Sequence, residues 1–471
     1  MLFNSIEFFI FLPIVFVLYW FVFNKNVKRQ NVFILVASYT FYGWWNWRFL
    51  ILIAFTSFCS WLSGFLIEEY RGDYRKAKCI NAANIIVNLL ILGVFKYYDF
   101  FIQSFADVFL GGKADGLLLR IILPVGISFY TFQALSYSID VYRNKLQPTK
   151  DVIQFFAFVA FFPQLVAGPI ERATNLLPQF ARARIVNYEQ ITSGLRQALW
   201  GLFKKMVIAD NLAVYVNLVF NDVENYSGFP LIWAAIFFTF QIYADFSGYS
   251  DIAIGTARIF GFDLMTNFRQ PYLSRSIKEF WNRWHISLSS WFRDYVYIPL
   301  GGNRVSYVRH CANLFITFTI SGLWHGANWT FVIWGAYYGV LLILEKLFCL
   351  KSYKIDDSFK INHLPKVVCT FVIVVFGWAL FRANTLSDVW YIYGNIFKFN
   401  SGIIGVPLVS VKTFIMMLLF IWLLFTVDFC KQIVLKREMK KIWRVLLVFL
   451  QIVGIYTLGV FEEQSFIYFQ F

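Results

Sequence analysis

Charged side chains are scarce in this sequence. Only 15% of its 471 residues are Asp, Glu, Lys or Arg, whereas 59% belong to the hydrophobic set AVILMFWYC. Soluble domains carry about 25% charged residues, so this composition excludes an ordinary soluble protein. Ser/Gly-rich and Pro-rich linkers are missing, and hydrophobic runs recur from end to end. The sequence therefore predicts an all-α polytopic membrane protein with a single membrane-embedded domain over residues 1–471.

Several motifs of other protein classes are missing too. The six cysteines form no closely spaced pairs, which argues against a zinc knuckle or a disulfide framework. The sequence has neither a Walker-type phosphate loop nor a GxSxG motif, so ATP hydrolysis and serine-hydrolase chemistry are not indicated. We expect no bound metal and no bound cofactor. The sequence also shows no internal repeat, which weakens a transporter interpretation because transporters are often built from repeated halves.

Hydrophobic runs of membrane-spanning length are what the sequence has instead. The first, over 5–23, is close to the ~20 residues that a helix needs, and it lacks the features of a cleavable signal peptide. Three basic residues follow within 25–29, so the positive-inside rule places the N-terminus outside. A helical pair over 31–67 turns at an aromatic belt around Trp44. Further spans are expected over 80–102, 117–140, 152–168, 196–220, 229–260, 313–346, 366–382, 411–429 and 443–460, giving about eleven to thirteen transmembrane or re-entrant helices.

The formal net charge of +15 has two interpretations. A basic protein can bind nucleic acid, but basic residues of a membrane protein also collect in loops that face anionic lipid head groups. The second interpretation fits the apolar composition better. We therefore expect membrane lipids as partners and no nucleic acid.

A lone histidine, His325, lies beside Trp324 in SGLWHGANWTF (321–331), within a stretch of 32 residues, 313–344, that contains no Asp, Glu, Lys or Arg. A polar side chain inside a membrane needs a partner or a function. One alternative is a structural hydrogen bond, with Ser321 one turn earlier as the local partner. The other is catalysis: a low dielectric keeps the imidazole neutral, so it can take a proton from a substrate hydroxyl. Asn328 would then share its face and donate a hydrogen bond to a reacting carbonyl.

The length of this hydrophobic segment is unusual for a membrane helix. It is too long for one untilted span and too short for two. Gly322 and Gly326 bracket the histidine, and glycine permits a break. We predict a tilted or broken helix that lines a cavity, because irregular backbone at membrane depth is tolerated only where protein or water covers it.

A second histidine, His285, lies in a basic and aromatic segment over 272–304. Apolar residues recur at spacings of three and four, which predicts one stripe of an interfacial amphipathic helix with His285 at its border. The cations of this segment have two interpretations: anchoring to lipid head groups, or binding of the phosphates of an acyl donor. The stripe consists of Trp281, Trp284, Leu288, Trp291 and Tyr295, and the candidate phosphate-binding cations are Lys278, Arg283 and Arg293.

Two acidic residues, Asp245 and Asp251, stand in the hydrophobic run YADFSGYSD (243–251). Because they are six residues apart, their side chains are separated by about 240° around the axis of a regular helix and cannot pair on one face. A break at Gly248 would change that angle. Carboxylates near a membrane are usually paired. The alternatives are a structural ion pair, with Arg258 as the expected partner of Asp251, or a role in a tunnel.

Five segments and the closing residues together carry a family pattern. The segments are PVGISFYTFQALSY (124–137), FFPQLVAGPIER (161–172), ADFSGYSDIAIG (244–255), FWNRWHISLSSWFRDYVYIPLGGNR (280–304) and SGLWHGANWTFVIWG (321–335), and the chain closes with SFIYFQF (465–471). They resemble the membrane-bound O-acyltransferase family, in particular the bacterial branch of the alginate O-acetylation membrane protein. The similarity covers essentially the whole chain.

The resemblance implies an enzyme of the bacterial cytoplasmic membrane whose helices surround a central tunnel or funnel. Such proteins move an acyl group, usually acetyl, from a cytoplasmic thioester toward a hydroxyl on the outer side. The histidine of the WHG motif is catalytic in the family, which is His325 here, and the histidine of the RWH motif is His285. The implied donor is acetyl-CoA or an acyl-phosphopantetheine carrier. The implied partners are an extracytoplasmic polysaccharide, such as alginate, a cellulose-like exopolysaccharide or peptidoglycan, and a secreted or membrane-anchored acetyltransferase.

Several alternatives stay open at this point. Acyl transfer can be direct or can pass through an acylated residue or partner. Within the family, a D-alanyl transferase of teichoic acids shares the RWH and WHG elements, although YIPLGGNR (297–304) looks more like the acetylating branch. A polysaccharide or lipid transporter without covalent chemistry is the alternative from another class.

Overall fold

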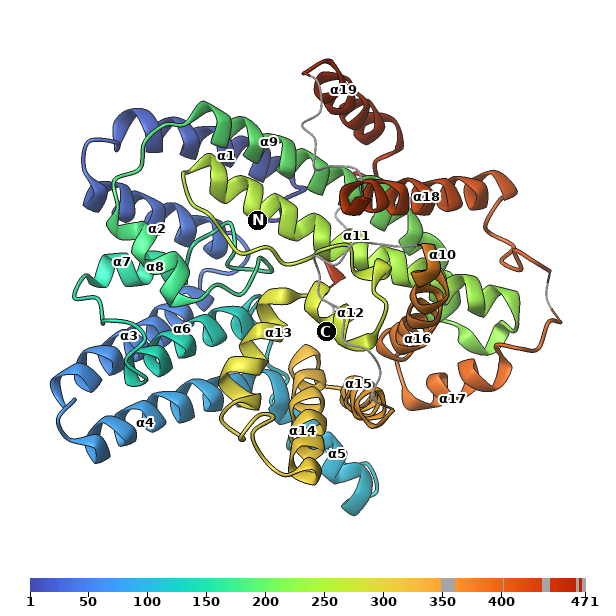
Figure 1. The fold of residues 1–471 in the computed structure, drawn as a ribbon, viewed down its shortest axis with the longest axis horizontal. Helices are drawn as coiled ribbons and strands as arrows, with labels where there is room; N and C mark the ends of the chain where they lie inside the picture. The colour runs from blue at the N-terminus through green and yellow to red at the C-terminus, as the bar shows by residue number, and fades with distance from the viewer. Residues whose placement is uncertain (349–360, 401, 434–440, 463–465, 468–471) are drawn as a thin grey trace. The chain divides into compact units, whose positions relative to one another are not determined.

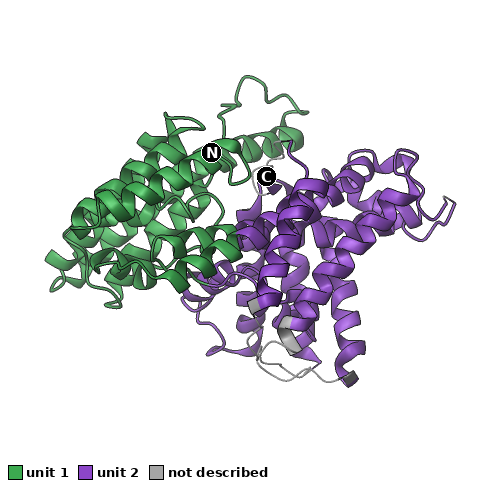
Figure 2. Ribbon diagram, turned by 90° about the horizontal axis from the view of Figure 1, so that it is seen from above, with its two compact units in different colours: residues 1–198, 252–265 green, residues 199–251, 266–471 purple. Residues whose placement is uncertain are grey.

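The computed structural model describes residues 1–348, 361–400, 402–433, 441–462 and 466–467. These residues form helices joined by turns and loops, with no β-strand among them (Figure 1). The chain forms two compact units, one of residues 1–198 and 252–265 and one of residues 199–251 and 266–471 (Figure 2). The predicted all-α class is confirmed, whereas the single domain over 1–471 stays a prediction.

The first unit holds the N-terminal helices. They are α1 (Ile6–Val17), the π-helical η1 (Leu18–Val22), α2 (Val27–Gly43), α3 (Phe49–Glu69), α4 (Tyr74–Leu92), the π-helical η2 (Gly93–Tyr97), α5 (Tyr98–Phe109), α6 (Ile127–Tyr142), α7 (Val152–Val159), α8 (Ala173–Ala181) and most of α9 (Tyr188–Phe203). Side chains cap several of these helices; Asn26 accepts hydrogen bonds from the first turn of α2, and Asp73 does so for α4. The predicted pair with a turn near Trp44 is confirmed by α2 and α3.

Two expected spans in this unit are wrong in part. The run over 117–140 becomes helical only at Ile127. The run over 152–168 forms a helix only as far as Val159, and the following residues make a buried, irregular loop. Pro163 lacks the backbone N–H that a continuing helix needs. In addition, the N–H of Phe162 donates to Oγ of Ser38 at 3.1 Å. The loop therefore satisfies its backbone through local turns, such as the N–H of Leu165 donating to the carbonyl oxygen of Phe161, together with this tertiary contact.

The second unit holds the remaining helices. They are the π-helical η3 (Lys204–Ala209), α10 (Asp210–Phe220), η4 (Val223–Asn225), α11 (Phe229–Ile259), η5 (Pro271–Leu273), α12 (Ile277–Arg283), α13 (Ile286–Phe292), the π-helical η6 (Arg293–Tyr297), α14 (Tyr307–His325), α15 (Trp329–Leu347), η7 (Ile361–His363), α16 (Leu364–Arg382), α17 (Leu386–Asn395), α18 (Val411–Ile433) and α19 (Lys441–Leu458). The last residues of α11, from Ile252 onward, belong to the first unit.

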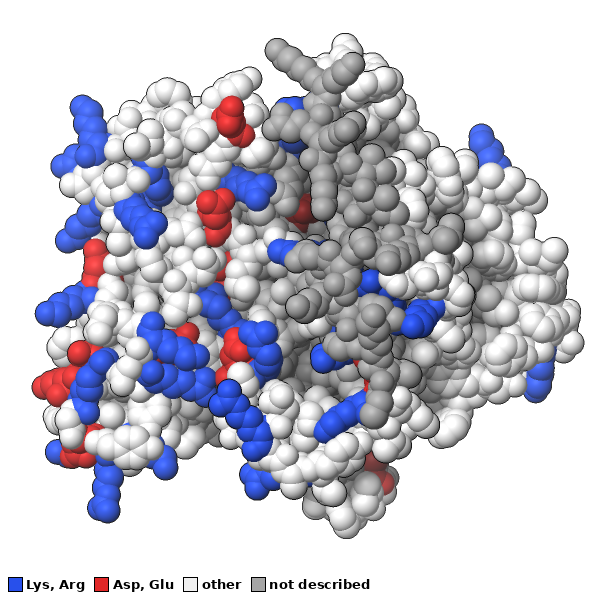
Figure 3. All heavy atoms as spheres, in the orientation of Figure 1, with Lys and Arg blue, Asp and Glu red and all other residues white. Residues whose placement is uncertain are grey.

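Six helical segments of the described chain are long and apolar enough to cross a membrane. They are Phe49–Glu69, Tyr74–Phe109, Phe229–Ile259, Trp329–Leu347, Leu364–Arg382 and Val411–Cys430. Large apolar side chains such as Phe21 (71% exposed) and Ile51 (68%) lie on the surface, as expected where lipid is the solvent. Figure 3 shows broad uncharged areas between the charged side chains of one face. The protein is therefore an integral membrane protein, and the count of eleven to thirteen helices, which includes re-entrant ones, stays a prediction.

Candidate active site

α14 and α15 form an antiparallel hairpin, and the helix breaks at His325. α14 ends at His325, and α15 starts at Trp329 after a short non-helical segment. A Cβ atom on Gly322 would clash with the backbone of α15, and one on Gly335 would clash with the backbone of α14. Only glycine therefore lets the two helices approach so closely. The predicted break within 313–346 is confirmed, and it leaves His325 at the closed end of the hairpin.

His285 lies at a second break. α12 ends at Arg283 and α13 starts at Ile286, and His285 between them has left-handed backbone angles (φ +43°, ψ +53°). A side chain with a Cβ atom adopts these angles only where surrounding contacts hold it. The prediction of one continuous amphipathic helix is therefore wrong, because a left-handed residue cannot continue a right-handed helix. Its aromatic stripe is also mainly buried, with Trp284 at 0% and Trp281 at 7% exposure.

Asn267 holds the turn at His285. Its backbone carbonyl oxygen accepts from the N–H of Ile286 at 2.9 Å. Its side-chain Oδ1 lies 3.1 Å from Nδ1 of His285 and 2.9 Å from Oγ of Ser287. Its Nδ2 donates to Oγ of Ser250 at 3.1 Å, which orients the amide with Oδ1 toward the histidine. Because Oδ1 only accepts, Nδ1 of His285 carries the hydrogen and Nε2 is the basic nitrogen of the neutral ring.

The two histidines meet inside the second unit. Their ring centroids lie 6.4 Å apart, and the side chains are 0% (His285) and 3% (His325) exposed. Burial lowers the pKa of His285 well below its usual value, and the nearby His325 lowers it further, so His285 stays neutral at physiological pH. We expected His285 at the border of a surface helix. It is buried instead, because its turn packs into the core of the unit.

Aromatic rings surround the histidine pair. The ring of Trp324 lies 5.1 Å from that of His325 and 6.2 Å from that of His285. Trp334 and Phe381 lie 5.1 and 5.6 Å from His325, and Phe246 lies 4.6 Å from His285. These centroid distances describe a packed apolar enclosure. Electrostatic interactions inside it are stronger than in water.

Asn328 and Ser321 occupy different settings near His325. Asn328 follows the end of α14 and caps α15: its Oδ1 accepts from the N–H of Thr330 at 3.0 Å, and its Nδ2 donates to the carbonyl oxygen of Asn384 at 3.0 Å. It therefore does not share a helix face with His325. Ser321 lies one turn before His325 on α14 and lines a cavity.

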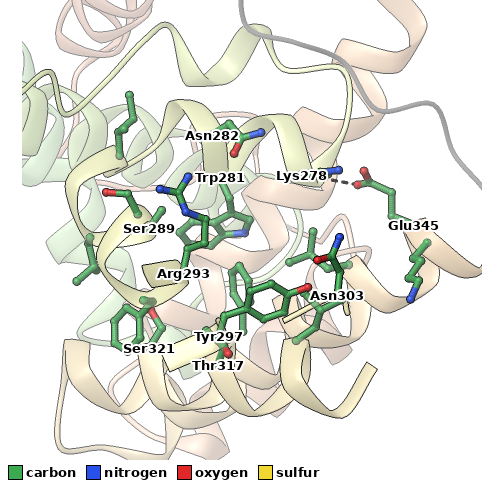
Figure 4. A pocket seen from close by; sticks show the side chains of 18 of the residues that line it. Lys278, Trp281, Asn282, Ser289, Arg293, Tyr297, Asn303, Thr317, Ser321 and Glu345 are labelled. Atoms are coloured by element: carbon green, nitrogen blue, oxygen red, sulfur yellow. Dashed lines mark hydrogen bonds between the residues drawn. The ribbon is translucent and has the colours of Figure 1, made fainter. Parts of the chain in front are cut away.

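This cavity has a volume of about 760 Å³ and is walled by α12, α13, η6, α14 and α15 (Figure 4). Its volume lies in the usual range for small-molecule sites, about 300–1,000 Å³. Its lining includes two of the three predicted cations, Lys278 and Arg293, and a third cation, Lys346. Trp281, also in the wall, packs its ring 5.6 Å from that of Trp334, which contacts His325. The cavity therefore borders the enclosure of the histidine pair.

The structure places Arg283 away from the cavity lining. Its Nη2 lies 2.9 Å from Oε1 of Glu279, and Nη2 of Arg275 lies at the same distance from that oxygen. The side chains of all three residues are at most 2% exposed. Glu279 thus neutralises part of a buried double charge, so Arg283 stabilises the fold.

Asp245 and Asp251 pair with two lysines of η3. Nζ of Lys205 lies 2.8 Å from Oδ1 of Asp245 and 2.8 Å from Oδ1 of Asp210. Nζ of Lys204 lies 2.7 Å from Oδ2 of Asp251. The structural pairing of both carboxylates is confirmed, but each partner comes from another helix.

Two details of that prediction are wrong. Arg258 donates to Gln197 at 2.8 Å, whereas Asp251 faces η3. Gly248 does not break α11, which is continuous from Phe229 to Ile259. A Cβ atom on Gly248 would lie 2.8 Å from the carbonyl oxygen of Gly201. This glycine therefore allows the close helix contact that brings the lysines to the carboxylates.

The closing motif is described only at Phe466 and Ile467; its other residues lie outside the described chain. The N–H of Ile467 donates to Oδ2 of Asp245 at 2.9 Å. The ring of Phe466 lies 4.7 Å from that of Tyr249 and 5.6 Å from that of Phe246. Because Phe246 contacts His285, a single side chain separates Phe466 from the histidine pair.

The sequence interpretation missed Asn267, Lys204 and Lys205. A single asparagine in FDLMTNFRQ (262–270) follows no pattern that marks it as a histidine partner. The two lysines did carry a signal, since they interrupt the hydrophobic run over 196–220. Asp245 and Asp251, in another hydrophobic run, needed cationic partners. Adjacent cations in such a run predict buried ion pairs.

Comparison with known proteins identifies the family. The model of the membrane-bound O-acyltransferase family matches residues 40–383. The probable alginate O-acetylase AlgI of Pseudomonas aeruginosa is 41% identical over 84% of this chain and 75% of its own length. The peptidoglycan O-acetyltransferase of Helicobacter pylori is 34% identical over 82% of this chain and 78% of its own length. The teichoic acid D-alanyltransferase of Bacillus subtilis is 26% identical over 77% of this chain and 92% of its own length.

The residues matched by the family model include both helix breaks and the histidines at them. The resemblance seen in the RWH and WHG motifs is thereby confirmed. The chain belongs to the membrane-bound O-acyltransferase family and is an integral membrane enzyme that transfers acyl groups.

Proposed function

We propose that this protein transfers acetyl groups from a cytoplasmic thioester to hydroxyls of an extracytoplasmic polysaccharide, directly or through a secreted or membrane-anchored partner. The observation that carries the proposal is the pair of buried imidazoles beside a cavity whose lining includes three cations. The relatives named for O-acetyl transfer share more identity with the chain than the relative named for D-alanyl transfer. This difference favours acetyl over D-alanyl as the transferred group.

The direction of transfer follows from the charges at the two ends of the α14–α15 hairpin. α15 is long enough to cross the membrane, so its ends face opposite sides. Five lysines and two aspartates follow its C-terminal end over 346–366, whereas 326–328 at the other end carry no charge. The positive-inside rule then places the Lys346 end in the cytoplasm and the closed end of the hairpin outside. The proposal includes the bacterial cytoplasmic membrane as the location and an N-terminus outside, as the basic residues over 25–29 predict.

The cavity is the proposed donor site. Lys278 and Arg293 offer cations for the phosphates of acetyl-CoA or of an acyl-phosphopantetheine carrier. Lys346 also lines it, held by Nδ1 of His310, whose Nε2 lies 2.8 Å from the hydroxyl of Tyr297. From this end the wall continues along α14 to Ser321. A pantetheine arm that follows this wall would bring its thioester toward His325.

The proposed chemistry is general-base catalysis. His325 takes the proton of the acceptor hydroxyl as the hydroxyl oxygen attacks the thioester carbonyl. The new C–O ester bond forms, the C–S bond breaks, and the imidazole gives its proton to the leaving thiolate. His285, through Nε2, is the second residue that we assign to catalysis. Positioned proton transfer of this kind contributes about 10²- to 10⁴-fold in rate.

Ester-linked acetate in the surface and wall polysaccharides of the host tests the proposal. The comparison uses a deletion strain complemented with wild type, His325→Ala or His285→Ala at matched protein levels, with His363→Ala as the control histidine. We expect the deletion strain and both site variants to lose acetate from one polysaccharide fraction, and His363→Ala to retain it. The fraction that changes identifies the acceptor.

Unchanged acetate in every fraction of the deletion strain would defeat the acetylation proposal. Loss of ester-linked D-alanine instead would assign the protein to the D-alanyl branch. Normal acetate with His325→Ala, in protein that is folded in the membrane, would remove His325 from the mechanism.

A further inference from the structure

A cluster of amide side chains surrounds Arg382 at the end of α16, apart from the cavity. Nη2 of Arg382 donates to Oδ1 of Asn217 at 3.0 Å and to Oδ1 of Asn221 at 3.1 Å. Its Nη1 donates to Oδ1 of Asn384 at 3.1 Å. Asn217 lies in the last turn of α10 and Asn221 directly follows this helix, which lies beside α16 in Figure 1. We call these four residues the amide cluster.

The amide cluster lies at the closed end of the α14–α15 hairpin. The carbonyl oxygen of Asn384 accepts from Nδ2 of Asn328, the cap of α15. Phe381, the residue before Arg382, packs its ring 5.6 Å from that of His325. Trp329 is 46% exposed, and exposed tryptophans at the end of a membrane span mark the membrane interface. The cluster is thus at the surface on the side of His325 away from the donor cavity.

The positive charge of Arg382 is not neutralised inside the described chain. All three hydrogen bonds of its guanidinium go to amide oxygens, and no described carboxylate lies within ion-pair distance. The aspartates of the flanking loops have other partners: Asp222 accepts from Asn225, and Asp388 accepts from the backbone N–H of Thr385.

The guanidinium also fixes which way the amides face. Because a guanidinium only donates, Asn217 and Asn221 turn Oδ1 toward Arg382 and Nδ2 away from it. Both asparagines are exposed. The guanidinium itself uses three of its five N–H groups. The cluster therefore presents N–H donors and one positive charge, which is complementary to a carboxylate.

We propose that the amide cluster binds a carboxylate of the acceptor polysaccharide and so holds a neighbouring hydroxyl near His325. The inference rests on the direct form of the proposed function, in which the polysaccharide itself enters the site, since it assigns the acceptor to the side opposite the donor cavity. Uronate sugars and peptide-bearing sugars both supply carboxylates, so the recognised chemistry is the same for either polymer.

A conservative variant separates ligand binding from a purely structural role. Asn221→Asp keeps the oxygen that accepts from Arg382, so the contact between α10 and α16 remains. It replaces the outward N–H₂ group with an oxygen and neutralises the guanidinium. Arg382→Gln removes the cation directly. Lys398→Gln is the matched control, because Lys398 is an exposed cation beyond α17 and outside the cluster.

The test measures binding of a fluorescent tetra-uronate to full-length protein in nanodiscs, beside a muramyl peptide and a neutral cello-oligosaccharide. We expect wild type and Lys398→Gln to bind one of the two carboxylate probes with similar Kd. We expect Asn221→Asp and Arg382→Gln to raise that Kd about tenfold and to leave binding of the neutral sugar unchanged. Hydrolysis of acetyl-CoA, measured in parallel, should stay at the wild-type rate in all variants.

Equal Kd values for wild type and Asn221→Asp would overturn the proposal, as would a wild type that binds neither carboxylate probe. Polysaccharide acetate that is normal in cells carrying Asn221→Asp would also overturn it. Absence of acetyl-CoA hydrolysis and of cellular acetylation in wild type would instead defeat the proposed function itself, so the two failures are distinguishable.

Discussion

The two ends of the α14–α15 hairpin carry different polar groups. The Lys346 end opens into a cavity with three cations, Lys278, Arg293 and Lys346, and the buried carboxylate of Glu345. The closed end carries the single guanidinium of Arg382 among asparagines. His325 lies at the closed end, behind the ring of Phe381.

This difference matches the two substrates that we propose for the two ends. Several cations suit the multiple phosphates of a coenzyme, whereas amide donors with one charge suit a single carboxylate beside sugar hydroxyls. The proposed donor site lies along the hairpin, and the proposed acceptor site lies at its closed end, joined to it by the hydrogen bond from Asn328 to Asn384. In this proposal donor and acceptor approach the same imidazole from opposite sides. Such positioning is itself a major source of rate enhancement.

Removal of Glu279 should have the largest effect, because it breaks the structural support of the cavity end. Glu279→Ala leaves the buried guanidiniums of Arg275 and Arg283 without their carboxylate. We expect the free energy of unfolding to fall by about 3–5 kcal/mol, measured by denaturant titration in detergent. Asp294→Asn, which breaks the exposed pair with Arg293, should cost at most about 1 kcal/mol. Equal losses in the two variants would contradict the buried role of Glu279.

Replacement of the cavity cations should weaken binding of the donor without weakening binding of the acceptor. The double variant Lys278→Gln, Arg293→Gln should raise the KM for acetyl-CoA or the carrier about tenfold, because charge-assisted bonds to phosphate are lost. Its Kd for the carboxylate probe should match that of wild type. A change in acceptor binding with unchanged donor KM would reverse the assignment of the two ends.

Acid pH should have the smallest effect, through His285. The pKa of His285 is lowered in the folded protein, so the unfolded chain takes up a proton as the pH falls below about 6.5. Stability is therefore fully present above about pH 6.5 and declines below it, by at most about 1.4 kcal/mol per pH unit. His285→Asn should show a shallower decline between pH 6.5 and 5.5, with His363→Ala as the control. Equal slopes in wild type and His285→Asn would show that the pKa of His285 is not lowered.

The fold was predictable where a local pattern determines it. Apolar runs marked most of the long helices, and the combination of length and glycines marked the break before Trp329. The run over 152–168 misled because Pro163 and tertiary hydrogen bonds end its helix early. Hydropathy alone does not contain that information.

The candidate site was predictable only in part. The motifs pointed to His285 and His325, but they lie 40 residues apart in sequence, and their contact depends on how separate helices pack. The left-handed turn at His285 is held by Asn267 from a distant loop, so the local apolar periodicity wrongly favoured one helix. The partner of Asp251 was sought along its own helix, whereas close packing at Gly248 supplied Lys204 from η3.

Sidedness of the two hairpin ends tests the central claim most directly. Single cysteines at Trp390, on the side of the amide cluster, and at Phe348, just beyond α15, are placed in a chain without its native cysteines, and intact cells are treated with an impermeant maleimide. Both positions are exposed, at 78% and 69%. We predict that Trp390→Cys reacts from outside, and that Phe348→Cys reacts only after the membrane is opened. Reaction of both from the same side, or the reverse pattern, would contradict transfer from a cytoplasmic donor cavity to an acceptor site outside.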